Sequence, residues 1–306
     1  MTLPLAILMD MDPHLLRTFV TVSRCGSFSE AARELGYTQS AVSQHIAALE
    51  SDLGAILLLR RPVAPTDVGV RLLEHAGPLL LRLDAARADI ARLTAAPAAR
   101  IVIGASPLAL SSQSTRTLAD LRQTQPRLEV TVRVLGREAI PREVATATLD
   151  LGLIDGMAAP NDPLHLADVG PLTAMAIAEQ PLAVALPAQH PLARRAGLRL
   201  VDLADARWID APGTAISLAQ LRTASGSDGY RAYLRYEGTD MRGLIALIAA
   251  GHGLALLPQP SIDGMPGISA VPLSAPRLVH RTEVLHSSTL DGPPALFAAA
   301  LTAATG

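Results

Sequence analysis

The chain has 306 residues, of which 49% are hydrophobic and 18% are charged, and its formal net charge is −2. This composition excludes an intrinsically disordered chain and supplies enough apolar side chains for two or three globular domains. No run of about 20 apolar residues is present, so we expect no membrane-spanning helix and no membrane partner. The N-terminal stretch has no basic region, and we expect no signal peptide.

The cysteine and lysine content excludes two further kinds of site. The single cysteine, Cys25, excludes an intrachain disulfide and fits a cytosolic protein. All 26 basic residues are arginines, which excludes a phosphate-binding loop that depends on lysine. Residues 1–66 hold five arginines against six acidic residues. Any DNA binding by this region therefore depends on where its arginines lie, because its net charge does not attract phosphates.

The first part of the chain predicts a head of three short helices. Their predicted N-caps are Asp12, Ser27 and Thr38. Glu30 completes a capping box with Ser27, and Gly36 is the expected left-handed stop of the second helix. Residues 27–53 thus read as a helix, a tight turn and a helix, which is the pattern of a DNA-binding helix-turn-helix.

The third predicted helix has two distinct faces. Its apolar face comprises Val42, Ile46, Leu49 and Leu53. Its small polar side chains suit contacts with base edges, for which the candidates are Gln39, Ser40, Ser43 and Gln44. The candidates for phosphate contacts are Arg33, Thr38, Arg60 and Arg61. The alternative is a solvated polar face that binds nothing.

Residues 67–94 predict a long helix that pairs with another helix. Apolar residues recur at alternating spacings of four and three, which is the heptad pattern of a coiled coil. The predicted dimer seam comprises Leu72, Ala76, Leu79, Leu83, Ala86, Ile90 and Leu93. The alternative is a single helix that lies on its own domain. Residues 95–99 are an expected hinge.

From Arg100 onward, short apolar strands alternate with helices, which predicts an α/β region with parallel sheets. The predicted strands are 101–104, 130–134 and 149–154, followed in a second sheet by 182–186, 208–209 and 254–257. Ser106 is expected to cap a helix opened by Pro107. A hydroxyl at a helix N-terminus favours an anion.

Several motifs together carry a family resemblance. They are SFSEAARELGYTQSAVSQHIAALESDLG at 27–54, LLLR at 57–60, TDVG at 66–69 and, more loosely, AGHGLALLP at 250–258. The chain resembles the LysR-type transcriptional regulators, although its wing at 61–65 is shorter than is usual in that family. The resemblance covers about residues 12–300.

The resemblance implies an α/β protein overall with two functional parts. The N-terminal part is an all-α winged helix-turn-helix at 12–66, joined to a long linker helix at 67–94 that mediates dimerisation. The C-terminal part is a two-lobed, periplasmic-binding-protein-like α/β effector domain. Its first lobe comprises 100–178 and 267–306, and its second lobe comprises 179–266.

An effector cleft is expected where the strand ends of the two lobes face each other, near 154–156 and 210–213. The expected effector-binding residues are Ser106, Leu135, Gly136, Arg137, Ile154, Pro212, Gly213 and Thr239. Ser106 and Arg137 favour an anionic effector. The alternative for both residues is ordinary capping or turn chemistry.

Other chemistry finds no support in the sequence. The eight histidines form no metal-binding pair, and no nucleophile–base–oxyanion set appears, so we expect no enzyme activity, no metal and no cofactor. The predicted function is sequence-specific transcriptional regulation controlled by a small molecule. Two alternatives remain at this point, namely a periplasmic-type binding protein or enzyme with an unrelated helical appendage, and an architectural DNA binder without an effector.

The predicted partners follow from that function. They are double-stranded DNA with two-fold related half-sites, a small-molecule effector, a second copy of the chain in a dimer or tetramer, and RNA polymerase. The expected location is the cytoplasm, in association with the nucleoid.

Overall fold

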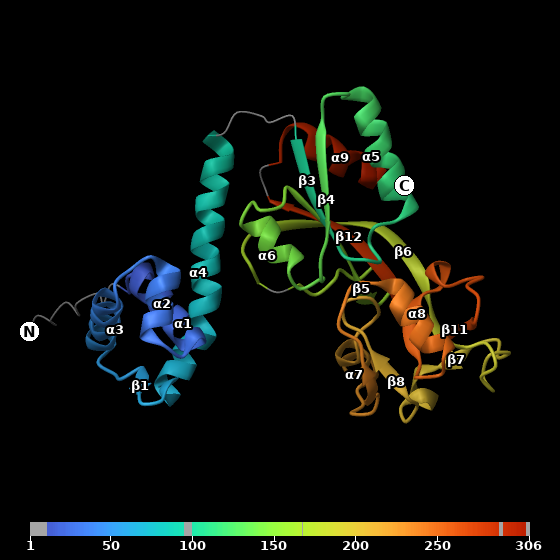
Figure 1. Ribbon diagram of the computed structural model, residues 1–306. Helices are drawn as coiled ribbons and strands as arrows, with labels where there is room; N and C mark the ends of the chain where they lie inside the picture. The colour runs from blue at the N-terminus through green and yellow to red at the C-terminus, as the bar shows by residue number, and fades with distance from the viewer. Residues whose placement is uncertain (1–10, 95–99, 167, 288–289, 304–306) are drawn as a thin grey trace, which may run out of the picture. The chain divides into compact units, whose positions relative to one another are not determined.

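The computed structural model describes residues 11–94, 100–166, 168–287 and 290–303 (Figure 1). These residues divide into two compact units, the first ending at Ala86 and the second beginning at Arg87. The predicted hinge at 95–99 lies outside the described residues. None of the described helices is long and apolar enough to cross a membrane.

The head of the first unit consists of α1 (Pro13–Cys25), α2 (Phe28–Leu35) and α3 (Gln39–Leu53). Each predicted N-cap accepts a hydrogen bond from a backbone N–H, since Asp12 binds His14, Ser27 binds Glu30 and Thr38 binds Ala41. Gly36 ends α2 with φ of 72°, the left-handed conformation that favours glycine. The predicted three-helix head is therefore present.

Two short strands and a long helix follow the head. Strands β1 (Leu58–Arg60) and β2 (Val63–Pro65) pair antiparallel and form the wing. Helix α4 (Asp67–Thr94) starts directly after the wing and continues through Pro78. Gly69 lets the start of α4 approach the head closely, because a Cβ at this position would lie 2.2 Å from the carbonyl oxygen of Leu57.

The strands of the second unit form an eight-stranded sheet, with a separate pair of strands beside it. The sheet order is β4-β3-β5-β12-β6-β11-β7, and β10 also pairs with β6. The strands are β3 (Arg100–Ala105), β4 (Glu129–Val134), β5 (Leu151–Ala158), β6 (Leu172–Pro187), β7 (Leu198–Arg199), β8 (Trp208–Asp210), β9 (Ala232–Arg235), β10 (Ala255–Pro258), β11 (Ile268–Ala275) and β12 (Val279–Ser287). The separate pair is β8 with β9.

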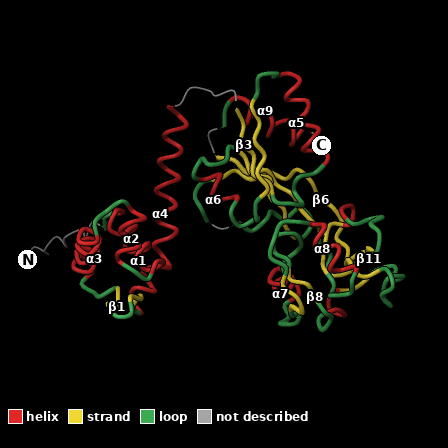
Figure 2. The backbone as a smooth tube through the Cα atoms, in the orientation of Figure 1, coloured by secondary structure: helices red, strands yellow, loops and turns green. Residues whose placement is uncertain are grey.

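The sheet differs from the predicted pair of parallel sheets. Strand β3 pairs parallel with β4 and β5, and β7 pairs parallel with β11, but β12 runs antiparallel to both β5 and β6. Strand β6 is long enough to run from the first lobe into the second, which joins the two expected sheets into one (Figure 2). The sequence prediction began β6 at residue 182 and so missed its first ten residues, because their apolar and polar residues alternate too weakly to be read as a strand.

Five helices of the described residues pack on the strands of the two lobes. They are α5 (Ser112–Thr124), α6 (Ile140–Ala145), α7 (Leu218–Ser225), α8 (Met241–Ala249) and α9 (Gly292–Ala303), with 3-10 turns η1 (Leu200–Leu203) and η2 (Gln259–Ser261). In the first lobe α5 and α9 lie side by side (Figure 1). Ile268 and Val271 of β11 belong to the cores of the second lobe, so the chain returns to the first lobe in β12, later than residue 267.

Candidate nucleic-acid interface and effector cleft

The head buries one face of α3 and exposes the other. Val42, Ile46 and Leu49 are fully buried in the core of the head. Ala31 and Ala32 of α2 are buried in the same core, and their small side chains allow the two helices to pack closely. Packing therefore holds α3 by its apolar face and leaves its polar face outward.

The outward face carries the predicted base-contact residues. Gln39, Ser40 and Gln44 are exposed, and Ser43 is half-buried. The Ser29 hydroxyl donates a hydrogen bond to Gln39 Oε1 at 3.2 Å, and Thr38 and Ser40 share a hydroxyl contact of 3.0 Å. These contacts are weak and solvent-exposed, so the side chains can exchange them for contacts with DNA.

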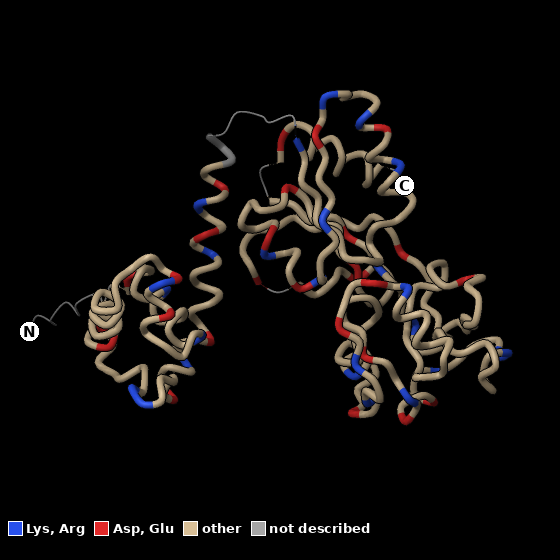
Figure 3. Tube along the Cα trace, viewed as in Figure 1, with Lys and Arg blue, Asp and Glu red and all other residues tan. Residues whose placement is uncertain are grey.

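The predicted phosphate-contact residues differ in how freely they can reach a phosphate. Arg61 is exposed in the turn of the wing. Arg60 instead donates to Glu50 at 3.1 Å and lies over the ring of Phe28, 5.0 Å from its centroid. Arg33 lies 3.5 Å from Glu30, and Thr38 uses its hydroxyl as the cap of α3. Figure 3 shows that basic and acidic residues are interspersed along the head, as the sequence count implied.

Two features of this surface were not anticipated from the sequence. Glu50 accepts hydrogen bonds from the backbone N–H groups of Leu57 and Leu58 as well as from Arg60, so it ties the wing to α3. Tyr37, which is exposed in the helix-turn-helix turn, makes an edge-to-face contact with His45 of α3. The only sequence signal for Tyr37 is an aromatic residue directly before the predicted cap of the recognition helix.

The predicted dimer seam on α4 divides into two parts. Leu72 and Ala76 pack into the core of the head, so their place in an intermolecular seam is corrected. Leu79, Leu83, Ala86 and Ile90 are exposed. The side chain of Leu93 lies outside the described residues. An apolar stripe therefore continues along α4 beyond the part that the head covers.

In the second unit, Arg137 joins the two lobes. Its guanidinium donates to Asp155 of its own lobe at 3.3 Å, and to the carbonyl of Ala215 at 3.0 Å and Gln220 at 3.3 Å in the other lobe. The side chain of Arg137 is only 13% exposed. We call this set of contacts the Arg137 bridge. It spans the position at which the sequence placed the effector cleft.

Asp155 is the anchor of the Arg137 bridge on the first lobe. Its Oδ2 atom lies 2.9 Å from Nε2 of His280 on β12, and both side chains are 1% exposed. Burial alone would raise the pKa of Asp155, but the hydrogen bond from His280 and the charge of Arg137 outweigh it and lower the pKa to about 2. The bridge therefore contains a carboxylate that stays ionised throughout the physiological pH range.

Ser106 does not occupy the predicted position at a helix N-terminus. The helix begins at Ser112 with Ser111 as its cap, and residues 107–109 form a turn. Ser106 is 1% exposed, and its hydroxyl accepts from the N–H of Asp155 and donates to the carbonyl of Leu153. It therefore supports the position of Asp155 and offers no free hydroxyl at a helix dipole.

The other predicted effector residues are placed as follows. Ile154 is 4% exposed and packs in the core of the first lobe, so its side chain is not accessible to an effector and its assignment is corrected. Leu135 is partly buried against the same core, Gly136 and Pro212 are half-buried, and Thr239 is exposed. Gly213 packs against Gly238, since a Cβ there would lie 2.3 Å from the carbonyl oxygen of Gly238. Of the predicted set, only Arg137 and Ser106 converge on one cluster, around Asp155.

The sequence missed Asp155, His280 and Gln220 as individual site residues. Asp155 had a usable signal, because it is a charged residue inside an otherwise apolar strand. His280 and Gln220 had none, since tertiary packing alone brings them to Arg137. The described residues contain no group of three or more histidine, cysteine or acidic side chains that could hold a metal ion.

Comparison with known proteins agrees with this architecture. Residues 13–70 match the family model of the bacterial regulatory helix-turn-helix protein, lysR family, and residues 94–303 match the LysR substrate binding domain. The chain is 31% identical over 274 residues to the small neutral protease regulatory protein of Streptomyces coelicolor, which covers 84% of this chain and 76% of that protein. It is also 31% identical over 265 residues to a probable hydrogen peroxide-inducible genes activator of Mycobacterium avium, and the match covers 86% of this chain and 79% of that protein.

Solved structures share the fold. Full-length BenM superposes with a TM-score of 0.55 at 24% identity, covering 95% of both chains. Full-length CbnR in complex with its target DNA superposes with a TM-score of 0.52 at 20% identity, covering 96% of this chain and 99% of that one. The matched family models together span both units. The chain therefore belongs to the LysR family and is a DNA-binding transcriptional regulator with an effector-binding domain, not an enzyme.

Proposed function

We propose that this regulator reads base edges with the outward face of α3 and contacts phosphates with its arginines. The observation that carries the proposal is the exposure of Gln39, Ser40 and Gln44 on a helix whose opposite face is fully buried. Gln and Ser side chains can pair with adenine edges and with other bases in the major groove. Arg61 is the main phosphate contact, with Arg33, Arg60 and Thr38 beside it.

The DNA promoter beside the regulator's own gene provides the test. In fluorescence anisotropy, Gln39→Ala and Gln44→Ala should each reduce the preference for this promoter over scrambled DNA about tenfold, because a lost base contact removes about 1–3 kcal/mol of discrimination. Arg61→Ala should weaken binding to both DNAs and reduce the salt slope by about one.

Gln123→Ala is the matched control, since Gln123 is an exposed glutamine on α5 in the effector domain. It should leave affinity and discrimination unchanged. If Gln39→Ala and Gln44→Ala both keep the wild-type preference, α3 does not read the sequence and the assignment is refuted.

We further propose that α4 pairs with α4 of a second copy, so that two heads address two-fold related half-sites. The exposed stripe of Leu79, Leu83, Ala86 and Ile90 supports this role. Such pairing can build a dimer or a tetramer. In the proposed division, residues 12–66 bind DNA, 67–94 pair and 95–99 act as a hinge. Residues 100–178 with the tail from β12 onward form the first lobe, and 179–266 with β11 form the second.

The proposed effector site is the cleft that the Arg137 bridge spans. Because the charge of Arg137 is already paired with Asp155, an anionic effector would have to replace the contacts to Asp155, Ala215 or Gln220. Such replacement would shift the balance between two arrangements of the lobes, which is how a small molecule can alter DNA binding. A regulator of this kind acts on chromosomal DNA, so we also propose cytoplasmic, nucleoid-associated location and contact with RNA polymerase.

A further inference from the structure

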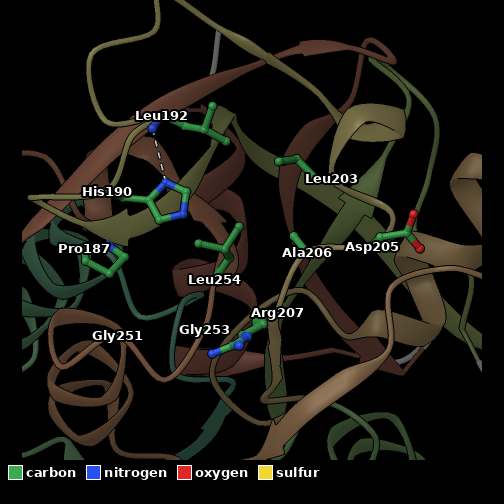
Figure 4. A pocket seen from close by; sticks show the side chains of 10 residues that line it. All are labelled: Pro187, His190, Leu192, Leu203, Asp205, Ala206, Arg207, Gly251, Gly253 and Leu254. Carbon is green, nitrogen blue, oxygen red and sulfur yellow. Dashed lines mark hydrogen bonds between the residues drawn. The ribbon is translucent and has the colours of Figure 1, made fainter.

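A cavity lies within the second lobe (Figure 4), and none of the residues of the Arg137 bridge lines it. Its volume is about 430 Å³, which falls within the range of small-molecule sites. Pro187, Leu192, Leu203 and Leu254 give it an apolar lining. Its polar side chains are His190, Asp205 and Arg207.

Main-chain contacts hold the walls of this cavity in place. The carbonyl of Arg207 accepts from the N–H of Leu254 at 2.7 Å, and the carbonyl of Pro187 accepts from the N–H of His190 at 2.9 Å. Gly253 makes the close approach to Arg207 possible, because a Cβ there would lie 2.8 Å from the Arg207 carbonyl oxygen. These contacts fix the backbone of the segments from which the lining side chains project.

The polar groups of the cavity favour one chemical class. Nδ1 of His190 accepts from the N–H of Leu192 at 3.2 Å, so the neutral ring carries its proton on Nε2 and can donate it to a ligand. Arg207 is exposed, and its guanidinium lies over the ring of Tyr233, 4.9 Å from its centroid, where it supplies a cation at the cavity. Figure 4 shows Asp205 on the far side of Ala206 from His190 and Arg207.

We propose that this cavity binds a small monocarboxylic acid with an apolar body. Its carboxylate would accept hydrogen bonds from Arg207 and His190, and its apolar part would rest on the leucine lining. The site is separate from the cleft, since Arg207 directly precedes β8 whereas the turn that holds Ala215 follows the other end of that strand. The proposal does not depend on where the main effector binds.

Calorimetric titration of the full chain with phenylacetate and with its neutral analogue phenylacetamide tests the proposal. Phenylacetate should bind with a dissociation constant of about 1 mM or tighter, and phenylacetamide at least about tenfold more weakly. Arg207→Gln should weaken phenylacetate binding about tenfold, and His190→Phe, which keeps the ring shape without the donor, should weaken it several-fold.

Two controls separate the cavity from other arginine sites. Arg235→Gln changes an exposed arginine of the same lobe and should keep wild-type binding of phenylacetate. Arg137→Gln instead tests the alternative site, since loss of binding in this variant would place phenylacetate at the Arg137 bridge. Melting followed by fluorescence of Trp208 shows whether each variant is folded. The proposal is overturned if phenylacetate does not bind, if the amide binds equally well, if a folded Arg207→Gln variant binds normally, or if Arg137→Gln abolishes binding.

Discussion

At the scale of single residues, position decides more than residue type. Arg60 and Arg61 are neighbours in the wing, yet Arg60 is held by Glu50 and Phe28 while Arg61 is exposed. Asp155 is a carboxylate like any other in the sequence, but the hydrogen bond from His280 and the charge of Arg137 lower its pKa to about 2. These differences arise from partners that are far away in the chain.

The low pKa of Asp155 predicts how stability depends on pH. A pKa lowered from 3.8 to about 2 favours the folded state above pH 3.8, and this contribution is lost as the pH falls toward 2. At pH 7 it corresponds to about 2 kcal/mol, at 1.36 kcal/mol for each pKa unit. Asp155→Asn should lower the free energy of unfolding by at least about this amount at pH 7, with a smaller deficit at pH 3.

Urea unfolding followed by fluorescence of Trp208, the single tryptophan, measures this difference. Asp162→Asn, at an exposed acid of the same lobe, is the control and should show no such deficit. A deficit that is equally large at pH 7 and pH 3 would contradict the role assigned to the ionised carboxylate.

At the scale of elements, helices α3 and α4 each have one face buried in the head and another face left exposed. For α3 the exposed face is polar, which suits DNA. For α4 it is apolar beyond Leu79, and exposed leucines at heptad spacing are costly for a helix that stays alone. The two exposed faces therefore suit different partners, DNA for α3 and a second apolar helix for α4.

The stripe on α4 predicts the effect of a charge placed within it. Leu83→Glu should raise the dissociation constant of the dimer about tenfold or more, because it removes an exposed leucine that helix pairing would bury and adds a charge at the seam. Sedimentation equilibrium of the full chain measures this change. Val70→Glu places the same charge on an exposed apolar position of α4 outside the stripe and should leave assembly unchanged. Equal loss in both variants, or none in either, would rule out the seam.

At the scale of the whole molecule, each of the two units is organised around its own cores, and the lobes of the second unit share strands as well as contacts. Strand β6 passes through both lobes, and β12 pairs with β5 and β6. The Arg137 bridge adds side-chain contacts between the lobes to these shared strands. We therefore expect the bridge to influence the relative arrangement of the lobes.

Removing the bridge should loosen that arrangement. In a Cys25→Ser background with spin labels at Gln123→Cys in the first lobe and Ala224→Cys in the second, Arg137→Gln should broaden or shift the distance distribution measured by double electron–electron resonance. Arg133→Gln is the matched control, because Arg133 pairs at 2.6 Å with Glu143 of its own lobe. Identical distributions in wild type and Arg137→Gln would show that the bridge does not hold the lobes.

The sequence by itself determined the elements whose signals are local. The caps at Asp12, Ser27 and Thr38, the left-handed Gly36 and the periodicity of α3 each involve neighbouring residues, so the helix-turn-helix and its outward face could be predicted correctly. The strand–helix alternation similarly indicated an α/β region, and the family resemblance implied that this region is an effector domain. These features depend on backbone chemistry within one or two turns of chain.

Only the tertiary structure decided what depends on contacts between distant segments. Ser106 looked like a helix cap, but its hydroxyl is used by Asp155, 49 residues away. Leu72 and Ala76 fit the heptad as well as Leu79 and Leu83 do, yet the head covers the first two. Sequence spacing states which residues share a face and cannot state what that face meets, because burial and pairing are set by the packing of the whole fold.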